Sequence, residues 1–178
     1  MKRRNELAVP YRLAVILSGV VLLLAGSLLA APGPQDKAAS AQKLTASAIQ
    51  VVRTQTSETL AIPEDFRVAT YENVIQQIEK TKKFQKIYRD GDRTAASVPD
   101  LVILKLVPSA YTAGSQKQRE VTTVKGATSI KINVQFTNKD GKVLLEKELE
   151  GKVRFYGENL KATYDFAKKV GKVVEESF

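Results

Sequence analysis

The stretch from residue 129 to residue 155 constrains the fold most, because its apolar residues recur at every second position. In SIKINVQF they alternate with polar residues, which places them all on one face of a half-buried strand. TNKDGK follows, where Asp140-Gly141 supplies the positive φ that a tight hairpin turn needs. KVLLEKELEGKVRF then alternates again, with one face formed by Val143, Leu145, Leu149, Val153 and Phe155. The sequence therefore predicts a long antiparallel hairpin, whose solvated face carries Glu146, Glu148, Glu150, Lys152 and Arg154.

Helix and strand patterns flank this hairpin on its N-terminal side. SAIQVVRTQ (47–55) is rich in β-branched residues and predicts a strand. In residues 62–83, Pro63, Glu64 and Asp65 are typical of a helix start. The apolar stripe expected on that helix is Phe66, Ala69, Val74, Ile75 and Ile78.

Three further elements complete the expected fold. KIYR (86–89) predicts a short strand, and LVILKLV (101–107), apolar at alternate positions on both faces, predicts a central strand covered on both sides. Residues 157–178 predict a closing helix whose stripe is Leu160, Tyr164, Ala167, Val170 and Val174. We therefore expect an α/β fold of the α+β type, a single small sandwich of a mixed, largely antiparallel sheet with two main helices.

The N-terminus predicts export. Residues 1–12 are basic, and residues 13–31 are apolar without a single charge, so we expect an export helix that is either a cleaved signal peptide or a retained signal anchor. Pro32, Gly33 and Pro34 break that helix and open a flexible tether over residues 32–43. Residues 44–178 would then form one domain outside the cytoplasm, either periplasmic or anchored to the inner membrane through residues 1–31.

Composition excludes several classes of activity. The chain has no Cys and no His, which removes disulfides, a lipidated Cys, Ser-His-Asp triads, Cys-His pairs and the usual zinc sites. An enzyme based on two carboxylates or on a Ser-Lys pair remains the alternative, although the acids fall on a helix start, a turn and a solvated strand face. We expect no catalytic activity, no cofactor and no metal.

The charge is +9 with a pI near 9.7. Lys and Arg alternate with acids and do not gather with aromatic residues, so no nucleic-acid partner is expected. Attraction to an anionic envelope surface accounts for the same charge.

Two loops are the candidate partner-contact surfaces. In YRDGDRTAASVPD, Asp90-Gly91-Asp92 resembles the start of a calcium loop but lacks the later oxygen ligands. We interpret it as a turn whose carboxylates are compensated by Arg89 and Arg93 and by backbone donors, or as a partner-contact loop. The second loop, TAGSQKQRE, is expected to protrude. The candidate contact residues are Arg89, Asp90, Asp92, Arg93, Lys117 and Arg119.

The helix ending in KKFQKIYR and the PDLVILKL strand are two recognisable segments, and the Asp140-Gly141 turn and the closing helix are two more. Together these four segments resemble a family of exported bacterial proteins of unknown function. The resemblance covers residues 50–174. It implies a small α/β sandwich and transfers no catalytic residue, and this chain lacks the lipidation Cys of the lipoprotein-like members. The order of elements is also similar to that of penicillin-binding-protein activators and the curli secretion channel, in topology only.

Together these features predict an exported, non-catalytic interaction module of the cell envelope. Its partner would be another envelope protein or an anionic envelope surface. The alternatives are a small envelope enzyme and a peripheral binder of anionic surfaces.

Overall fold

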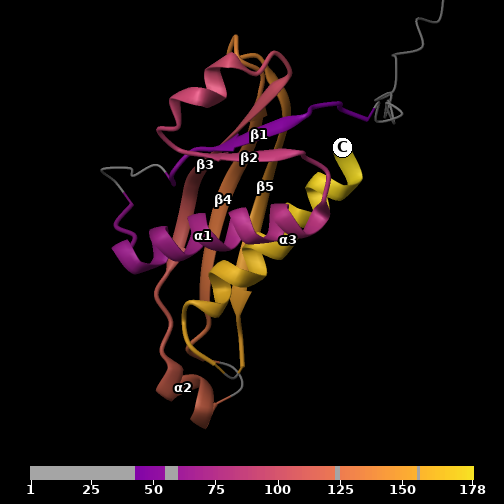
Figure 1. Ribbon diagram of the computed structural model, residues 1–178. Coiled ribbons are helices and arrows are strands. Elements are labelled where there is room, and N and C mark those ends of the chain that lie inside the picture. Colours follow the sequence, from indigo (N-terminus) through magenta and orange to yellow (C-terminus); the bar gives the residue numbers. More distant parts are fainter. Residues whose placement is uncertain (1–42, 55–59, 123–124, 156) are drawn as a thin grey trace, which may run out of the picture. The chain divides into compact units, whose positions relative to one another are not determined.

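The computed structural model describes residues 43–54, 60–122, 125–155 and 157–178 (Figure 1). The predicted export helix and nearly all of the predicted tether lie outside the described residues. The strands are β1 (Ala48–Val51), β2 (Lys86–Arg89), β3 (Leu101–Thr112), β4 (Thr128–Thr137) and β5 (Val143–Val153). The helices are α1 (Glu64–Thr81), the 3₁₀ helix η1 (Arg93–Ser97), α2 (Gln116–Val121) and α3 (Lys161–Ser177).

The five strands form one mixed sheet in the order β2-β1-β3-β4-β5. β1 pairs in parallel with β2 and with β3, whereas β4 is antiparallel to both β3 and β5. The expected α+β class, the mixed sheet and the two main helices are therefore confirmed. The short helix α2 was not predicted, because its segment reads as a polar loop.

The core lies between the sheet and the two long helices, which cover the same face of the sheet (Figure 1). The predicted alternation of β4 is confirmed, since Ile130, Ile132, Val134 and Phe136 are fully buried. On α1 the buried positions include Phe66, Val74, Ile75 and Ile78, as expected.

The stripe of α3 differs from the expected one. Ala167, Val170 and Val174 are buried, but Tyr164 is 40% exposed and Phe166 is fully buried in its place. The reason lies on β5, where a Cβ added to Gly151 would be 2.5 Å from the Cβ of Phe166. The missing side chain at Gly151 lets α3 approach the sheet closely, and Phe166 fills the contact.

The hairpin turn is the predicted one. Gly141 has a φ of +80°, and its N–H donates to the carbonyl of Asn138 at 3.1 Å. Two residues of the expected apolar face are corrections, because β5 ends at Val153 with Phe155 beyond it 55% exposed, and Val143 at the start of the strand is 46% exposed. The solvated face is paired locally, with the Glu146 carboxylate accepting hydrogen bonds from the side-chain amides of Asn133 and Gln135.

β3 is central but only partly covered on its second face. η1 contributes Ala95 to a small cluster with Ala48, Tyr88 and Leu101 on the face away from the long helices. Further along β3, Lys105 and Val107 are half-exposed. The expectation of cover on both sides therefore holds only for the first residues of this strand.

The outer edge of β5 is partly closed by α3. The backbone N–H of Lys152 donates to the Asp165 carboxylate at 3.0 Å, and the Lys169 ammonium donates to the Glu150 carbonyl at 2.6 Å. Lys169 and Asp165 are themselves ion-paired at 2.9 Å. Two side chains of one helix thus take the hydrogen-bonding places of a neighbouring strand.

Across the described ranges, no helix is both long enough and apolar enough to span a membrane.

Candidate functional site

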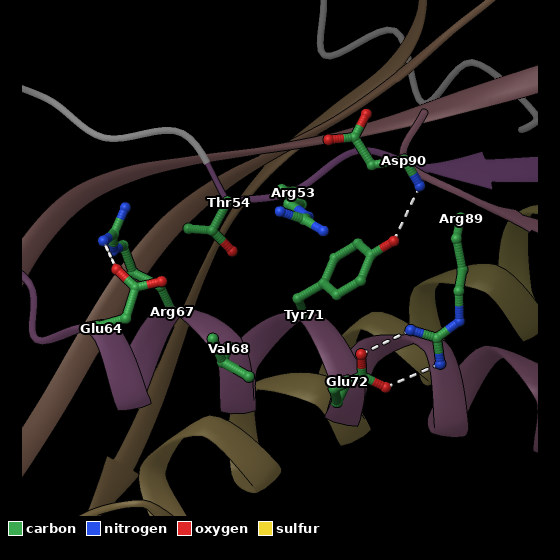
Figure 2. A pocket seen from close by; sticks show the side chains of 9 residues that line it. All are labelled: Arg53, Thr54, Glu64, Arg67, Val68, Tyr71, Glu72, Arg89 and Asp90. Carbon is green, nitrogen blue, oxygen red and sulfur yellow. Dashed lines mark hydrogen bonds and ion pairs between the residues drawn. The ribbon is translucent and has the colours of Figure 1, made fainter. Parts of the chain in front are cut away.

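A cavity of about 390 Å³ lies where β1 and β2 end, beside the first half of α1. Because β1 and β2 are parallel, their carboxyl ends meet at the same edge of the sheet, which is a common position for ligand sites in α/β proteins. The polar lining comes from three elements and includes Arg53, Thr54, Arg67, Tyr71, Arg89 and Asp90 (Figure 2).

Arg89 forms an ion pair with Glu72 on α1. Its two terminal nitrogens donate to the two carboxylate oxygens at 2.6 and 2.9 Å, a bidentate geometry. These bonds hold the pKa of Glu72 below its usual range and raise that of Arg89. The predicted compensation of Asp90 and Asp92 by Arg89 is therefore wrong, because the guanidinium turns to the neighbouring helix.

Arg67 is held by a residue of its own helix. Its guanidinium forms an ion pair with Glu64, one turn earlier on α1. The Nε of Arg67 is buried and has no hydrogen-bond partner among the described residues. Part of this guanidinium is thus turned inward with its donor unused.

Tyr71 and Thr54 form the inner part of the cavity. The Tyr71 hydroxyl accepts a hydrogen bond from the backbone N–H of Asp90 at 2.9 Å, which ties the end of β2 to α1. Thr54 is only 7% exposed, and its Oγ1 has no partner in the part of the chain that the structure describes. Figure 2 shows the Tyr71 ring between Thr54 and Arg89.

The Asp90–Arg93 segment is a turn, as expected, but it is stabilised differently. Gly91 has a φ of +81°, and the Asp92 carboxylate accepts from the N–H and the hydroxyl of Thr94 at 2.9 and 2.7 Å. These bonds cap η1 and lower the pKa of Asp92. Backbone compensation is thus confirmed for Asp92, whereas Arg93 forms no ion pair within the described ranges.

The structure separates the six predicted contact residues. Only Arg89 and Asp90 line the cavity. Asp92 and Arg93 belong to η1 and its cap, and Lys117 lies exposed on α2. No group of three or more Asp or Glu side chains that could hold a metal ion occurs among the residues with described positions.

Arg119 is a correction, because it does not protrude. It is 2% exposed, and its guanidinium donates to the carbonyls of Gly126 and Gly157 at 2.6 and 2.5 Å. It also donates to the Asn159 side-chain oxygen at 3.0 Å and to the Thr128 hydroxyl at 3.2 Å. Arg119 therefore ties three separate segments together and offers no surface to a partner.

The sequence did not single out Arg53, Thr54, Arg67 or Tyr71. Each lies within an expected strand or helix, and Tyr71 falls beside the expected apolar stripe of α1. Only the folded chain brings them together, because the cavity is lined by the ends of β1 and β2 and by α1, the helix that connects these strands.

The Glu72–Arg89 pair predicts a pH dependence. Glu72 has a folded-state pKa below its ordinary value of 4.5 because Arg89 donates to it. The stability contributed by the pair is therefore fully present above that ordinary value and is lost as the pH falls through the lowered one. At pH 7, Glu72→Gln should cost about 0.5 kcal/mol, since the pair is exposed.

Thermal unfolding measured at several pH values from 7 to 3 tests this pH dependence of the stability. The difference between the parent and Glu72→Gln should disappear at the acidic end, whereas Glu175→Gln, an exposed position on α3 outside every ion pair of the described residues, should unfold like the parent over this pH range. A difference that persists at pH 3 would contradict the assignment to this ion pair.

Comparisons with known proteins reveal a shared fold. No family model matches the sequence, and no curated protein matches it significantly. The fold is similar to that of PelC from Paraburkholderia phytofirmans, solved as a dodecamer, with a TM-score of 0.52 and 7% identity over 77% of this chain and 91% of that chain. A PelC variant in a second crystal form aligns with a TM-score of 0.52 and 9% identity, over 76% of this chain and 91% of that chain.

A protein from Xanthomonas campestris of family DUF330 aligns with a TM-score of 0.46 and 11% identity, over 76% of this chain and 83% of that one. The specific family resemblance predicted from the sequence remains a prediction.

Proposed function

We propose that this chain is an exported, non-catalytic interaction module of the cell envelope, and that it binds its partner at the cavity between α1 and the ends of β1 and β2. The observation that carries the proposal is the polar lining of that cavity. It combines arginines, a tyrosine and a buried threonine hydroxyl from three elements. Groups that converge in this way with unused donors are typical of binding sites.

Export is supported by the sequence. Residues 13–31 carry no charge and follow a basic segment, so the domain would be delivered across the membrane. A binding role is favoured over catalysis because the chain has no His and no Cys, and because the cavity's Glu64 and Glu72 are held in ion pairs with arginines. The second candidate partner, an anionic envelope surface, is supported by the +9 charge alone.

Single cysteines provide the test, because the chain contains no native Cys. Val68 lines the cavity and is 51% exposed, and Val143 at the start of β5 is 46% exposed, so Val68→Cys and Val143→Cys are a matched pair. In osmotically shocked cells, both should react with a membrane-impermeant maleimide, because both lie outside the cytoplasm. Protection of both until the cytoplasm is lysed would contradict export.

The same pair tests the binding surface. A thiol-attached photocrosslinker in envelope preparations should capture a protein from position 68 and not from position 143. Replacement of Asp90 by Asn and Arg89 by Gln should reduce that capture. Equal capture from both positions would contradict the cavity as the contact site, and capture of lipid alone would favour the anionic surface.

A further inference from the structure

The cavity has hydrogen-bond donors that the fold does not use. Thr54 Oγ1 and Arg67 Nε are buried without a partner among the described residues, and both residues line the cavity. The Tyr71 hydroxyl accepts from Asp90 N–H, and it donates in no hydrogen bond that involves only described residues. A buried donor that lacks an acceptor raises the free energy of the folded state. Thr54 Oγ1 and Arg67 Nε are both shielded from solvent in the free chain, so a ligand that presents acceptor oxygens would remove that penalty once the two side chains rotate to meet it.

We propose that the cavity binds a carboxylate, specifically the C-terminal carboxylate of a short peptide. This inference rests on the binding function proposed above and adds the chemical class of the ligand. A guanidinium can only donate hydrogen bonds, so a group that meets Arg67 or Arg53 in the cavity must accept. A hydroxyl of threonine or tyrosine donates equally well to a carboxylate oxygen.

The charges around the cavity favour a monoanion. Its three arginines are balanced by the three carboxylates of Glu64, Glu72 and Asp90. Two of the arginines are already ion-paired, and the exposed Arg53 forms no ion pair with a carboxylate at the described positions. A single negative charge is matched by Arg53, whereas the second charge of a dianionic phosphate would meet no arginine that is still without a carboxylate partner and would be repelled by Asp90.

The apolar part of the lining and the size of the cavity favour a peptide end. Val68 is half-exposed at the cavity and the Tyr71 ring lies beside the donors, so an aliphatic side chain next to the carboxylate has apolar contacts (Figure 2). The volume of about 390 Å³ suits one or two residues.

The test uses the full chain in detergent, labelled with ¹⁵N, and titrates N-acetyl-alanyl-alanine with a free carboxylate. The backbone amides of Arg89, Asp90 and Gly91, next to Tyr71, should shift saturably. The C-terminal amide of the same dipeptide and inorganic phosphate should each bind at least about tenfold more weakly, as expected for the loss of one charge-assisted hydrogen bond or the addition of repulsion.

Two variants separate binding from folding. Thr54→Val removes the unpartnered hydroxyl at constant shape, so the melting temperature should equal or exceed that of the parent while binding weakens by about tenfold. Arg53→Gln should weaken binding, whereas Arg93→Gln, the same charge change outside the cavity, should leave it unchanged.

Absence of saturable shifts with the free carboxylate, equal binding of the amide, tighter binding of phosphate, or unchanged binding by Thr54→Val would each overturn the proposal. If these outcomes occur while cross-linking from position 68 persists, the interaction function stands and the ligand is not a carboxylate. If cross-linking also fails, the proposed function fails with it.

Discussion

Replacing Ile132 by aspartate is expected to abolish cooperative unfolding. Ile132 is fully buried in the middle of β4, between Pro108 on β3 and Leu149 on β5. A carboxylate there has no cation opposite it on the neighbouring strands, and an unpaired buried charge costs at least about 3–5 kcal/mol. That is a large part of the roughly 5–15 kcal/mol that stabilises a typical domain.

The measurement is thermal or urea unfolding followed by circular dichroism. Ser129→Asp, on the same strand, adds the same charge on the half-exposed solvated face opposite Lys152 and should unfold like the parent. Val134 is a poorer choice for this test because Lys147 lies directly opposite on β5 and could pair with the new carboxylate. If both aspartate variants melted like the parent, the assignment of the two faces of β4 would be wrong.

Replacing Arg119 by methionine should cost about 2–4 kcal/mol, since several charge-assisted hydrogen bonds are lost together and their acceptors stay buried. Methionine retains most of the apolar volume, so the loss reports the guanidinium. The four acceptors lie around the start of β4 and in the loop before α3, at Gly126, Thr128, Gly157 and Asn159. Hydrogen exchange should therefore increase in both segments.

Lys117→Met is the matched control on the same short helix, where an exposed lysine is replaced by the same residue. Its effect should stay within about 0.5 kcal/mol, as for most surface substitutions. Arg119→Lys should recover only part of the loss, because an ammonium cannot reproduce the planar fork of donors. Equal stability of the two methionine variants would mean that Arg119 has no structural role.

The sequence predicted the elements that depend on local periodicity. It did not predict the positions of side chains whose hydrogen-bonding partners are distant along the chain. The alternation of apolar and polar residues is enough to predict β4, and the Asp-Gly dipeptide is enough to predict the turn at Asp140-Gly141. Arg119 lies in a polar segment, and arginine is most often exposed. Its burial is explained by the carbonyls that accept its hydrogen bonds, which lie up to 38 residues away. The same holds for Arg89, whose partner Glu72 is 17 residues earlier on α1 and not in the adjacent turn.

The cavity shows the same limit at a larger scale. Thr54 and Tyr71 carry no sequence signal, because a threonine near a strand end and a tyrosine in a helix are common in any fold. They become candidates for function only when the crossover from β1 through α1 to β2 brings strand ends and helix face together. The closing helix was placed correctly, but its rotation depends on the close approach at Gly151, which periodicity does not encode.

Lys169 and Asp165 of α3 form hydrogen bonds to the backbone at the outer edge of β5, and this clasp has a consequence for solubility. An exposed edge strand of eleven residues offers a template on which other chains can stack into fibrils. Here the backbone at Glu150 and Lys152 is already occupied by side chains of α3, and Lys147 places a charge between Leu145 and Leu149 on the inward face. Removing both charges of the clasp should therefore promote aggregation in concentrated solution more than it destabilises the fold.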